Sequence, residues 1–371
     1  MRAQAPLILS IFATFAVGGP QVRFAALANH YGRAWRHAII AMDGRYDSAE
    51  RLSPSLDVTF PAVDTAGGVL TNLAVFRRAL GRLAPDVLVT HNWGSIDWAM
   101  ANLVPGGVRH VHIEDGFGPE EATTQFRRRI LWRRLVLQRS SIVLPSLTLK
   151  KIATEVWRLP PARLHYIPNG LDLHRFRPAA ALQARAKVRG DTAPLIGAVA
   201  TLRAEKNLSR LLRAARLLHD EGTAFRLAIV GGGPERPKLE ALAADLGLGD
   251  AVVFEGALAD PAQAYRALDV FALSSDTEQM PLSVLEAMAS GLPVAATTVG
   301  DVPQMLAAEN QPYLAKTDDA ALAAALRPLL RDASLRRTVG AANRLKAERD
   351  YDAQVMFRRY GELLTKRASA A

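Results

Sequence analysis

The chain has 371 residues, which is too long for one ordinary domain and fits two domains of common size. It contains no cysteine, so disulfide bonds, thiolate metal sites and cysteine nucleophiles are excluded. Its formal net charge of +10 favours phosphate-bearing ligands, nucleic acid or anionic lipid as partners. Because the basic residues form no stripe interleaved with aromatic residues and no known nucleic-acid module, we expect no nucleic-acid partner.

Apolar strand-like runs alternate with amphipathic helical stretches along the whole chain, the pattern of parallel sheets wrapped by helices. In the first half the predicted strands are 7–15, 37–42, 86–91, 108–114, 141–145 and 164–168. In the second half they are 195–201, 226–230, 251–255, 270–274 and 293–297. The sequence therefore predicts an α/β protein with two doubly wound sheets.

The first apolar run, residues 6–17, has two interpretations. It resembles the core of a signal peptide, with Arg2 before it and a small-residue segment after it. However, only one basic residue precedes the run, and the run ends in a Gly-Gly-Pro turn, so we expect a strand. No run reaches the roughly 18 apolar residues of a membrane span, and we expect a cytoplasmic location.

The turn after this first strand contains Gly18 and Gly19 and leads into a predicted helix. Glycines at such a turn allow backbone N–H groups to face an anion at the start of the helix.

Two strands of the first half end in polar clusters. His91, Asn92 and Trp93 end the strand 86–91, and the segment 110–118 reads His-Val-His-Ile-Glu-Asp-Gly-Phe-Gly. In a strand, residues 110, 112 and 114 share one face and residues 113 and 115 share the other, so not all of them belong to a core. We therefore expect a polar site at this edge of the sheet, where Trp93 and Trp98 offer aromatic rings to a ligand.

Residues 126–139 predict a cationic amphipathic helix with Phe126, Ile130, Leu131 and Trp132 among its apolar positions. Two interpretations remain open. The helix lies on an anionic membrane surface, attracted by about 1 kcal/mol per arginine, or its apolar stripe packs on the first sheet. The arginines concerned are Arg127, Arg128, Arg129, Arg133 and Arg134.

The apolar periodicity lapses between Pro168 and Pro194, which predicts a domain boundary. We place the first domain at residues 1–170 and the second at residues 171–351, with a final helix after residue 351.

Two loops of the second domain carry features that suit an anion. Arg203 and Lys206 precede a helix, where a cation opposes the helix dipole unless it shares an anion. The turn Gly231-Gly232-Gly233 follows the strand 226–230 and lets backbone come close to a ligand. It is not a dinucleotide fingerprint, because Arg236 stands where glycine or alanine is needed.

Glu278 and Glu286 are separated by seven residues. Glu278 is predicted in a loop at the carboxyl end of the strand 270–274, and Glu286 in the helix that follows Pro281. Ligands of open α/β sheets bind at this end of the strands. Two carboxylates there suit a ligand with vicinal hydroxyls, because an ionised carboxylate accepts hydrogen bonds from both.

This Glu-x7-Glu spacing, followed by Ala-Met-Ala-Ser-Gly-Leu-Pro-Val, resembles the motif of glycosyltransferase family 4. The segments Pro168-Asn-Gly-Leu-Asp172 and Glu205-Lys-Asn207 are also similar to family motifs. Two departures stand out. Gln279-Met280 replaces the usual Gly-Phe, and Thr201 stands at the position of a usual arginine, with Arg203 two residues further on.

The resemblance implies the GT-B architecture, in which two doubly wound Rossmann-like domains face each other across a cleft. The N-terminal domain, 1–170, would bind the acceptor, and the C-terminal domain, 171–351, would bind a nucleotide-sugar donor. A C-terminal helix, within 352–371, would return to the first domain. The resemblance also implies retention at the anomeric carbon, no metal site and no cofactor.

By the same resemblance, Lys206 and Arg203 hold the donor diphosphate, Glu286 holds the ribose and Glu278 holds the transferred sugar. The family's catalytic histidine corresponds to Asp115 when Glu-x-Gly is aligned, and to His112 when the strand alone is aligned. The acceptor-side candidates are His91, Asn92 and Trp93. The remaining donor-side candidates are Gly18, Gly19, Gly232, Phe254, Gln279, Met280, Pro281 and Leu282.

We therefore expect a retaining, metal-independent, hexosyltransferase-type enzyme of bacterial polysaccharide, lipopolysaccharide or glycolipid biosynthesis. Its partners would be a nucleotide sugar and a sugar or lipid-linked acceptor, and it would be cytoplasmic, peripheral at the inner face of the cell membrane. Two alternatives are a nucleotide-sugar epimerase with the same fold and a catalytically silent sugar-nucleotide-binding subunit.

Overall fold

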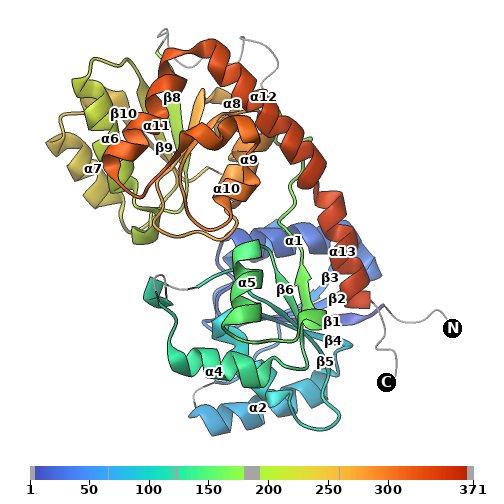
Figure 1. The fold of residues 1–371 in the computed structure, drawn as a ribbon. Helices are drawn as coiled ribbons and strands as arrows, with labels where there is room; N and C mark the ends of the chain where they lie inside the picture. The colour runs from blue at the N-terminus through green and yellow to red at the C-terminus, as the bar shows by residue number, and fades with distance from the viewer. Residues whose placement is uncertain are drawn as a thin grey trace. The chain divides into compact units, whose positions relative to one another are not determined.

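A computed structural model of the chain describes residues 5–65, 67–117, 119–121, 124–178, 193–258 and 260–365 (Figure 1). The chain divides into two compact units. Unit 1 comprises residues 1–169 and 356–371, and unit 2 comprises residues 170–355.

Unit 1 contains a parallel seven-stranded sheet with the strand order β3-β2-β1-β4-β5-β6-β7. The order reverses next to β1, so β1 and β4 are neighbours although two strands separate them in the sequence. All carboxyl ends of these strands lie at one edge, which is where polar loops gather. The strands are β1 (Leu7–Phe12), β2 (Arg36–Ala41), β3 (Asp57–Thr59), β4 (Val87–His91), β5 (Arg109–Ile113), β6 (Ser141–Leu144) and β7 (Leu164–Tyr166).

Helices cover both faces of this sheet. One face packs Leu9 and Ile11 against Phe76 and Trp98, and the other packs Phe12 against Phe24. The helices of unit 1 are α1 (Gly19–Tyr31), α2 (Val69–Leu83), α3 (Ile96–Ala101), α4 (Arg127–Val136), α5 (Leu147–Glu155) and most of α13 (Ala353–Thr365).

Unit 2 repeats the plan with a parallel six-stranded sheet in the order β10-β9-β8-β11-β12-β13. Its strands are β8 (Leu195–Val199), β9 (Arg226–Val230), β10 (Val252–Gly256), β11 (Val270–Leu273), β12 (Val294–Thr297) and β13 (Leu314–Ala315). Its helices are α6 (Leu208–Asp220), α7 (Arg236–Asp245), α8 (Ala262–Ala267), α9 (Leu282–Ala289), α10 (Val302–Met305), α11 (Asp319–Arg331) and α12 (Ala333–Asp350).

The prediction of two doubly wound Rossmann-like domains is confirmed. The strands β3 and β13 were not predicted from the sequence. They have three and two residues, which is too few to show an apolar periodicity. The basic helix is shorter than predicted and spans Arg127–Val136, and the last helix ends at Thr365 within the described residues. Most of the predicted linker, residues 179–192, and the end of the predicted last helix, residues 366–371, lie outside the described residues.

Across the described residues, every helix is too short or too polar to cross a membrane.

Candidate functional site

Lys206 and Glu278 form an ion pair at the carboxyl end of the sheet of unit 2. The Lys206 Nζ atom lies 2.6 Å from Glu278 Oε1, and the side chains are 24% and 10% exposed. Ser275 Oγ donates a second hydrogen bond, of 2.8 Å, to the same oxygen. The sequence predicted both residues at one site, and the structure brings them into direct contact. The pair places a cation and a carboxylate side by side at a partly exposed position.

The two loops that carry this pair are joined along their backbones. Ser274 Oγ donates to the carbonyl of Lys206 (3.0 Å), and the Asp276 N–H donates to the carbonyl of Glu205 (2.9 Å). Arg210, which lies buried on α6, donates to the carbonyl of Ser274 and to Asp276 Oδ1, each at 2.6 Å. Because these bonds join the two loops and Arg210 anchors the second loop to α6, the positions of the lysine and the glutamate are coupled.

The glycine turn after β9 packs against the same region. A Cβ atom at Gly231 would lie 1.8 Å from the carbonyl oxygen of Ala200, and one at Gly233 would lie 2.4 Å from that of Leu202. Only glycine allows this approach, since both residues also have a positive φ. Gly232, between them, has no atom closer than 3.8 Å to such a Cβ. Close backbone packing therefore explains the glycines at 231 and 233. The space next to Gly232 is open.

Glu286 lies on α9, partly buried, and accepts a 2.7 Å hydrogen bond at Oε2 from the hydroxyl of Tyr265. Burial raises the pKa of Glu286 to about 7, although the Tyr265 hydrogen bond and Arg175 act to lower it. Near neutral pH this carboxyl group therefore exists in both the protonated and the ionised form. The ionised form can accept hydrogen bonds from a diol through its second oxygen.

The segment between the two glutamates is fixed by the loop after β12. A Cβ atom at Gly300 would lie 2.1 Å from the carbonyl oxygen of Glu278, and the Asp301 N–H donates to the carbonyl of Gln279 (2.9 Å). Met280 is buried in the core below α9, and Pro281 and Leu282 begin that helix. The Met280 side chain therefore packs inside unit 2.

Two further donor-side candidates lie close by but differ in exposure. Arg203 is exposed, and within the described part of the chain its side chain forms no ion pair. Phe254 lies on β10 and is partly buried, and Arg236 donates to its carbonyl oxygen (3.2 Å). The guanidinium of Arg203 is thus open to an anion, whereas the carbonyl group of Phe254 already has a partner.

At the edge of the sheet of unit 1, Asp115 forms a two-pronged ion pair with Arg23 of α1. The Arg23 nitrogens lie 2.5 and 2.9 Å from the two carboxylate oxygens, and Arg23 also donates to Asn169 Oδ1 (3.0 Å). Burial acts to lower the pKa of Arg23, but the facing Asp115 outweighs burial and raises it. Asn92 accepts the backbone N–H of Asp115 (2.7 Å). Both side-chain oxygens of Asp115 are therefore occupied by Arg23, so Asp115 is not a free polar group.

The alternative residue, His112, is fully buried. Its Nδ1 atom lies 2.8 Å from Thr90 Oγ1 and its Nε2 atom 3.4 Å from Glu114 Oε2. Thr90 also contacts His110 (2.7 Å), which reaches Ser140 (2.6 Å). The His112 ring is thus enclosed within unit 1, and its role as a catalytic candidate stays a prediction.

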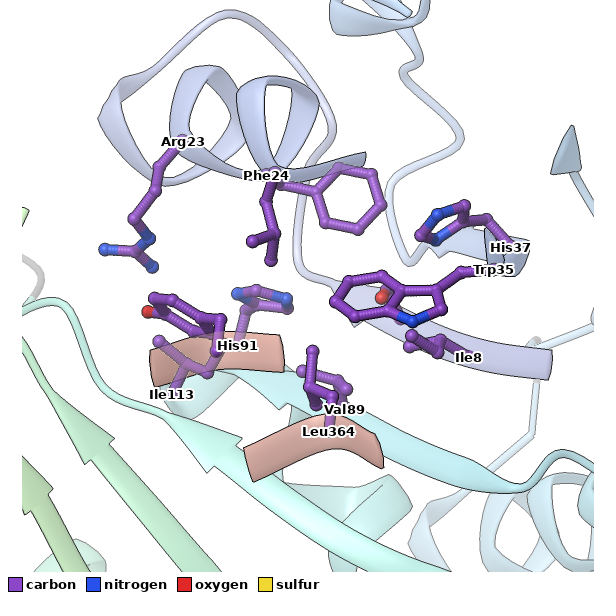
Figure 2. Close-up of a pocket in the computed structure, with 12 residues that line it drawn as sticks. Ile8, Arg23, Phe24, Trp35, His37, Val89, His91, Ile113 and Leu364 are labelled. Atoms are coloured by element: carbon purple, nitrogen blue, oxygen red, sulfur yellow. The ribbon is translucent and has the colours of Figure 1, made fainter. Parts of the chain in front are cut away.

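The acceptor-side candidates are also more enclosed than the sequence suggests. His91 is buried and stacks on Phe12, with ring centroids 3.9 Å apart, and it lines an internal cavity below Arg23 (Figure 2). The ring of Trp93 is covered by the guanidinium groups of Arg129 and Arg133, each 5.1 Å from its centroid. His91 and Trp93 are therefore part of the packing of unit 1, and Trp98, also proposed as a stacking ring, packs on Phe76 in the core.

Gly18 and Gly19 lie where predicted, at the start of α1. Gly18 is the N-cap residue, and its carbonyl accepts the N–H of Val22 (2.9 Å). A Cβ atom at Gly18 would lie 2.8 Å from Gln21 Oε1, whose side-chain nitrogen donates to the carbonyl of Thr14. The turn is thus compact, and its role towards an anion stays a prediction.

Not all of the five arginines named for the helix 126–139 lie on its surface. Arg133 is fully buried, Arg129 pairs with Glu120 and Glu121, and Arg134 donates to the carbonyl of Trp157 (3.3 Å). Only Arg127 and Arg128 of the five named arginines are exposed. The helical period is the cause, because positions 129, 133 and 136 share the inward face of the helix.

Sequence analysis missed three residues that shape these sites: Arg23, Arg210 and Tyr265. Arg23 is the single charged residue of its apolar helical stretch, and that isolation is a detectable signal, because a charge on a core-facing stripe needs a partner. Arg210 gives no such signal, since Arg213 and Arg216 follow it on the same helix. Tyr265 carries no such signal, since a tyrosine is common in a core. Within the described residues, no three histidine, aspartate or glutamate side chains gather as a metal-binding group.

Two family profiles match the chain, one in each half. The profile described as "Glycosyltransferase Family 4" matches residues 17–175, and that described as "Glycosyl transferases group 1" matches residues 182–346. The second match includes the Lys206–Glu278 pair and Glu286, and the first includes the Arg23–Asp115 pair.

Two curated relatives and one solved structure illustrate the similarity. The D-inositol 3-phosphate glycosyltransferase of Stackebrandtia nassauensis is 29% identical over 309 residues, which cover 76% of this chain and 69% of the relative. The GDP-mannose-dependent alpha-(1-6)-phosphatidylinositol monomannoside mannosyltransferase of Mycolicibacterium smegmatis is 34% identical over 224 residues, 57% of this chain and 58% of the relative. The chain thus spans little more than half the length of the second relative.

The structure of Anabaena Alr3699/HepE in complex with UDP-glucose has a TM-score of 0.81 and 18% identity. The structural match covers 97% of this chain and 99% of the Anabaena chain. At this identity the likeness shows a shared fold over both units.

Proposed function

Because the chain belongs to glycosyltransferase family 4, we propose that it transfers a sugar from a nucleotide-sugar donor to a hydroxyl-bearing acceptor, with retention at the anomeric carbon. The observation that carries the proposal is the 2.6 Å pair of Lys206 and Glu278, in a loop pair that α6 and the glycine turn hold rigidly. It supplies a cation for a leaving diphosphate and a carboxylate for sugar hydroxyls at one place.

Unit 2 is proposed to bind the donor. A nucleoside diphosphate gains negative charge as the glycosidic bond breaks, and a preorganised cation stabilises that charge. Lys206 provides this cation, and the exposed Arg203 provides a second. The ionised form of Glu286 accepts hydrogen bonds from the ribose hydroxyls while Tyr265 holds its other oxygen.

The proposed reaction needs no residue to act as a free base. Asp115 is held by Arg23 and His112 is buried, so neither side chain is placed to take a proton from an incoming hydroxyl. We therefore propose that the leaving phosphate accepts the proton of the acceptor hydroxyl as the new bond forms. We also propose that Lys206 and Arg203, with no metal ion, neutralise the leaving group.

Unit 1 is proposed to bind the acceptor. The names of two relatives refer to an inositol phosphate and to a phosphatidylinositol mannoside, which are polyhydroxylated and carry phosphate. An acceptor of this class, a sugar or a lipid-linked sugar of bacterial glycolipid or polysaccharide synthesis, fits the net positive charge of the chain.

A thermal-shift screen tests the donor proposal. A ligand that binds only the folded protein at 100 times its Kd stabilises the protein by about 2.7 kcal/mol. We expect a rise in Tm with UDP, GDP or their sugar conjugates, and a smaller rise for Lys206→Met. A panel in which no nucleoside diphosphate and no nucleotide sugar changes Tm would contradict the proposal.

The outer face of α4 is proposed to contact a membrane surface at the inner face of the cell membrane. Leu131, Trp132 and Leu135 are 52%, 43% and 54% exposed, and Arg127 and Arg128 lie exposed at the start of the helix. Exposed apolar side chains beside cations suit the boundary between lipid headgroups and acyl chains. Two exposed arginines, where the sequence suggested five, attract an anionic surface by about 2 kcal/mol in total.

Liposome co-sedimentation tests this face. We expect binding to vesicles that contain anionic lipid, weaker binding in high salt, and loss of binding for the double variant Leu131→Ser/Trp132→Ser. The variant Arg139→Gln, at an exposed arginine beyond the end of α4, serves as the control and should bind as the wild type does. Equal recovery with neutral and anionic vesicles would exclude an electrostatic contribution from Arg127 and Arg128.

A further inference from the structure

One buried side chain of α4, Arg133, organises the loop that follows β5. Its Nε atom lies 3.2 Å from Glu114 Oε2, at the start of the loop, and its terminal nitrogen lies 3.4 Å from Glu121 Oε2, near the end. Arg133 is 0% exposed. Both ends of the described loop are therefore tied to one guanidinium group.

Aromatic rings enclose the same guanidinium. Its central carbon lies 5.1 Å from the ring centroid of Trp93, 4.9 Å from that of Trp157 and 5.3 Å from that of Phe117. Phe117 belongs to the loop itself. Such cation–π contacts are strongest where water is excluded, as it is here. The N–H groups at the edge of the guanidinium thus contact carboxylates, and its planar faces lie near aromatic rings.

Burying these charges is costly, and a cluster of apolar side chains in their place is often as stable. The Arg133 side chain therefore adds little as a source of stability. An arginine instead orients its partners, because the N–H groups of its planar guanidinium point in fixed directions and each carboxylate has to align with them. Glu114 is held as a carboxylate in this way: burial acts to raise its pKa, but Arg133 and His112 outweigh burial and lower it.

The residue next to Glu114 is held from the other side of the sheet. Glu114 points towards α4 and Arg133, while Asp115 points towards α1, where Arg23 binds both of its oxygens. Adjacent residues of an extended segment face opposite ways, so the two arginines grip the dipeptide from opposite faces.

We propose that Arg133 is a positioning residue that, opposite Arg23, fixes the orientation of Asp115 and of the described parts of its loop, residues 114–117 and 119–121. Arg133 touches no substrate, because it is fully buried. The inference rests on the proposed function only in taking Asp115, which aligns with the family's catalytic histidine, as part of the acceptor site of unit 1.

Three variants test the proposal. Arg133→Met removes the cation and leaves Glu114 and Glu121 buried without it, so this variant is expected to unfold at a lower temperature. The triple variant Arg133→Met/Glu114→Gln/Glu121→Gln removes all three charges and is expected to recover most of the Tm. Arg133→Lys keeps the charge but not the planar group. Arg139→Met, at an exposed arginine near the same helix, is the matched control.

The deciding measurement is the crystal structure of the triple variant, or of Arg133→Lys if the triple variant does not fold. We expect residues 114–117 and 119–121 of the loop to shift and Asp115 to lose at least one of its two contacts with Arg23. An unchanged loop with both contacts kept would overturn the proposal, whatever the stability of the variant.

Kinetics give a second, independent measurement. With the donor identified, we expect kcat/KM for the acceptor to fall by about 10- to 100-fold in the folded variants, as for a misplaced reacting group, with the Kd for the nucleoside diphosphate unchanged. A normal kcat/KM in a variant with a shifted loop would also overturn the proposal. A wild-type protein that transfers no sugar would contradict the proposed function instead, and the crystal structure would still decide the role of Arg133.

Discussion

Four of the charged candidate residues already have a partner within their own unit, whereas the exposed Arg203 forms no ion pair within the described part of the chain. Lys206 pairs with Glu278, Glu286 accepts a hydrogen bond from Tyr265, and Asp115 pairs with Arg23. These contacts hold the groups in place before a ligand binds, which lowers the entropic cost of ordering the side chains on binding. They also mean that a diphosphate has to compete with Glu278 for Lys206.

For Glu286, substitution by glutamine is expected to separate stability from binding. Its folded pKa of about 7 lies above its ordinary value of 4.5, so its contribution to stability is present below pH 4.5 and is lost as the pH rises through 7. At pH 8, Glu286→Gln removes a buried charge and should raise Tm by a few degrees. It should also weaken nucleotide binding, because the ribose loses a charged acceptor.

Calorimetric unfolding at pH 6 and pH 8, with nucleotide titrations at both, checks this expectation. Glu278→Gln is the companion variant, expected to bind free nucleoside diphosphate as the wild type does, because Glu278 is assigned to the sugar. An unchanged nucleotide Kd in Glu286→Gln would contradict the assignment of the ribose to Glu286.

Lys206→Ala is expected to reduce turnover by about 10² to 10³, or 2.7 to 4 kcal/mol of transition-state stabilisation, because it removes a cation that meets growing charge. Arg203→Ala tests whether the exposed arginine acts in the same way, since its guanidinium is open to an anion. Steady-state rates with the identified donor provide the measurement. A wild-type rate in Lys206→Ala would mean that the lysine serves only to hold Glu278.

At the scale of elements, α6 works as the anchor of the donor-side loops. Its apolar residues Leu208, Leu211 and Leu212 pack in the core, and Arg210 on the same helix reaches the loop after β11. Because α6 is packed in the core, the loops that carry Lys206 and Glu278 are held in place by their contacts with this helix. In unit 1, α1 and α4 act similarly on Asp115 and Glu114 through Arg23 and Arg133.

Arg210→Met is expected to loosen the donor-side loops. Each hydrogen bond to a charged group contributes about 1.5–3 kcal/mol, so we expect a lower free energy of unfolding and a weaker Kd for the nucleoside diphosphate. Denaturant unfolding and nucleotide titration measure the two effects. The control is Arg213→Met, one turn further along α6, where the arginine is exposed and pairs with Asp319. Equal behaviour of the two variants would refute a special role for Arg210.

At the scale of the whole molecule, the two units have separate cores and separate responses to pH. Unit 1 contains three enclosed histidines with lowered pKa values: burial lowers that of His37 to about 4, burial and His112 lower that of His110 to about 3, and burial, Arg23 and His112 lower that of His91. In unit 2, burial raises the pKa of Glu286 instead.

Acidification is therefore expected to destabilise unit 1 and not unit 2. Above pH 6.5 the histidines are neutral in both the folded and the unfolded state. Below it only the unfolded chain binds protons, which costs about 1.4 kcal/mol per histidine at pH 5.5. Over the same range, protonation of Glu286 in the folded state stabilises unit 2. Scanning calorimetry from pH 7.5 to 5.5 should show a transition of unit 1 that moves down and separates from that of unit 2.

A His37→Gln/His91→Gln variant serves as the control for this expectation. It lacks two of the three groups that titrate, so its first transition should move less with pH than that of the wild type. Transitions that shift together in both proteins would contradict the assignment to the histidines.

The sequence by itself was enough for the parallel sheets, the helix after Pro281 and the place of Lys206, Glu278 and Glu286. Each of these depends on local information: a buried strand reads as an apolar run, proline begins a helix, and the carboxyl ends of parallel strands meet at one edge. The two-domain α/β fold followed from the alternation of these signals along the chain.

Only the tertiary structure decided which charges are buried and what they contact. The sequence showed five similar arginines around α4, yet Arg133 is enclosed by three rings and two carboxylates while Arg127 and Arg128 are exposed. The pairs Arg23–Asp115 and Arg210–Asp276 join residues 92 and 66 positions apart. Such partners are chosen by the packing of distant elements, and no local period or propensity records that choice.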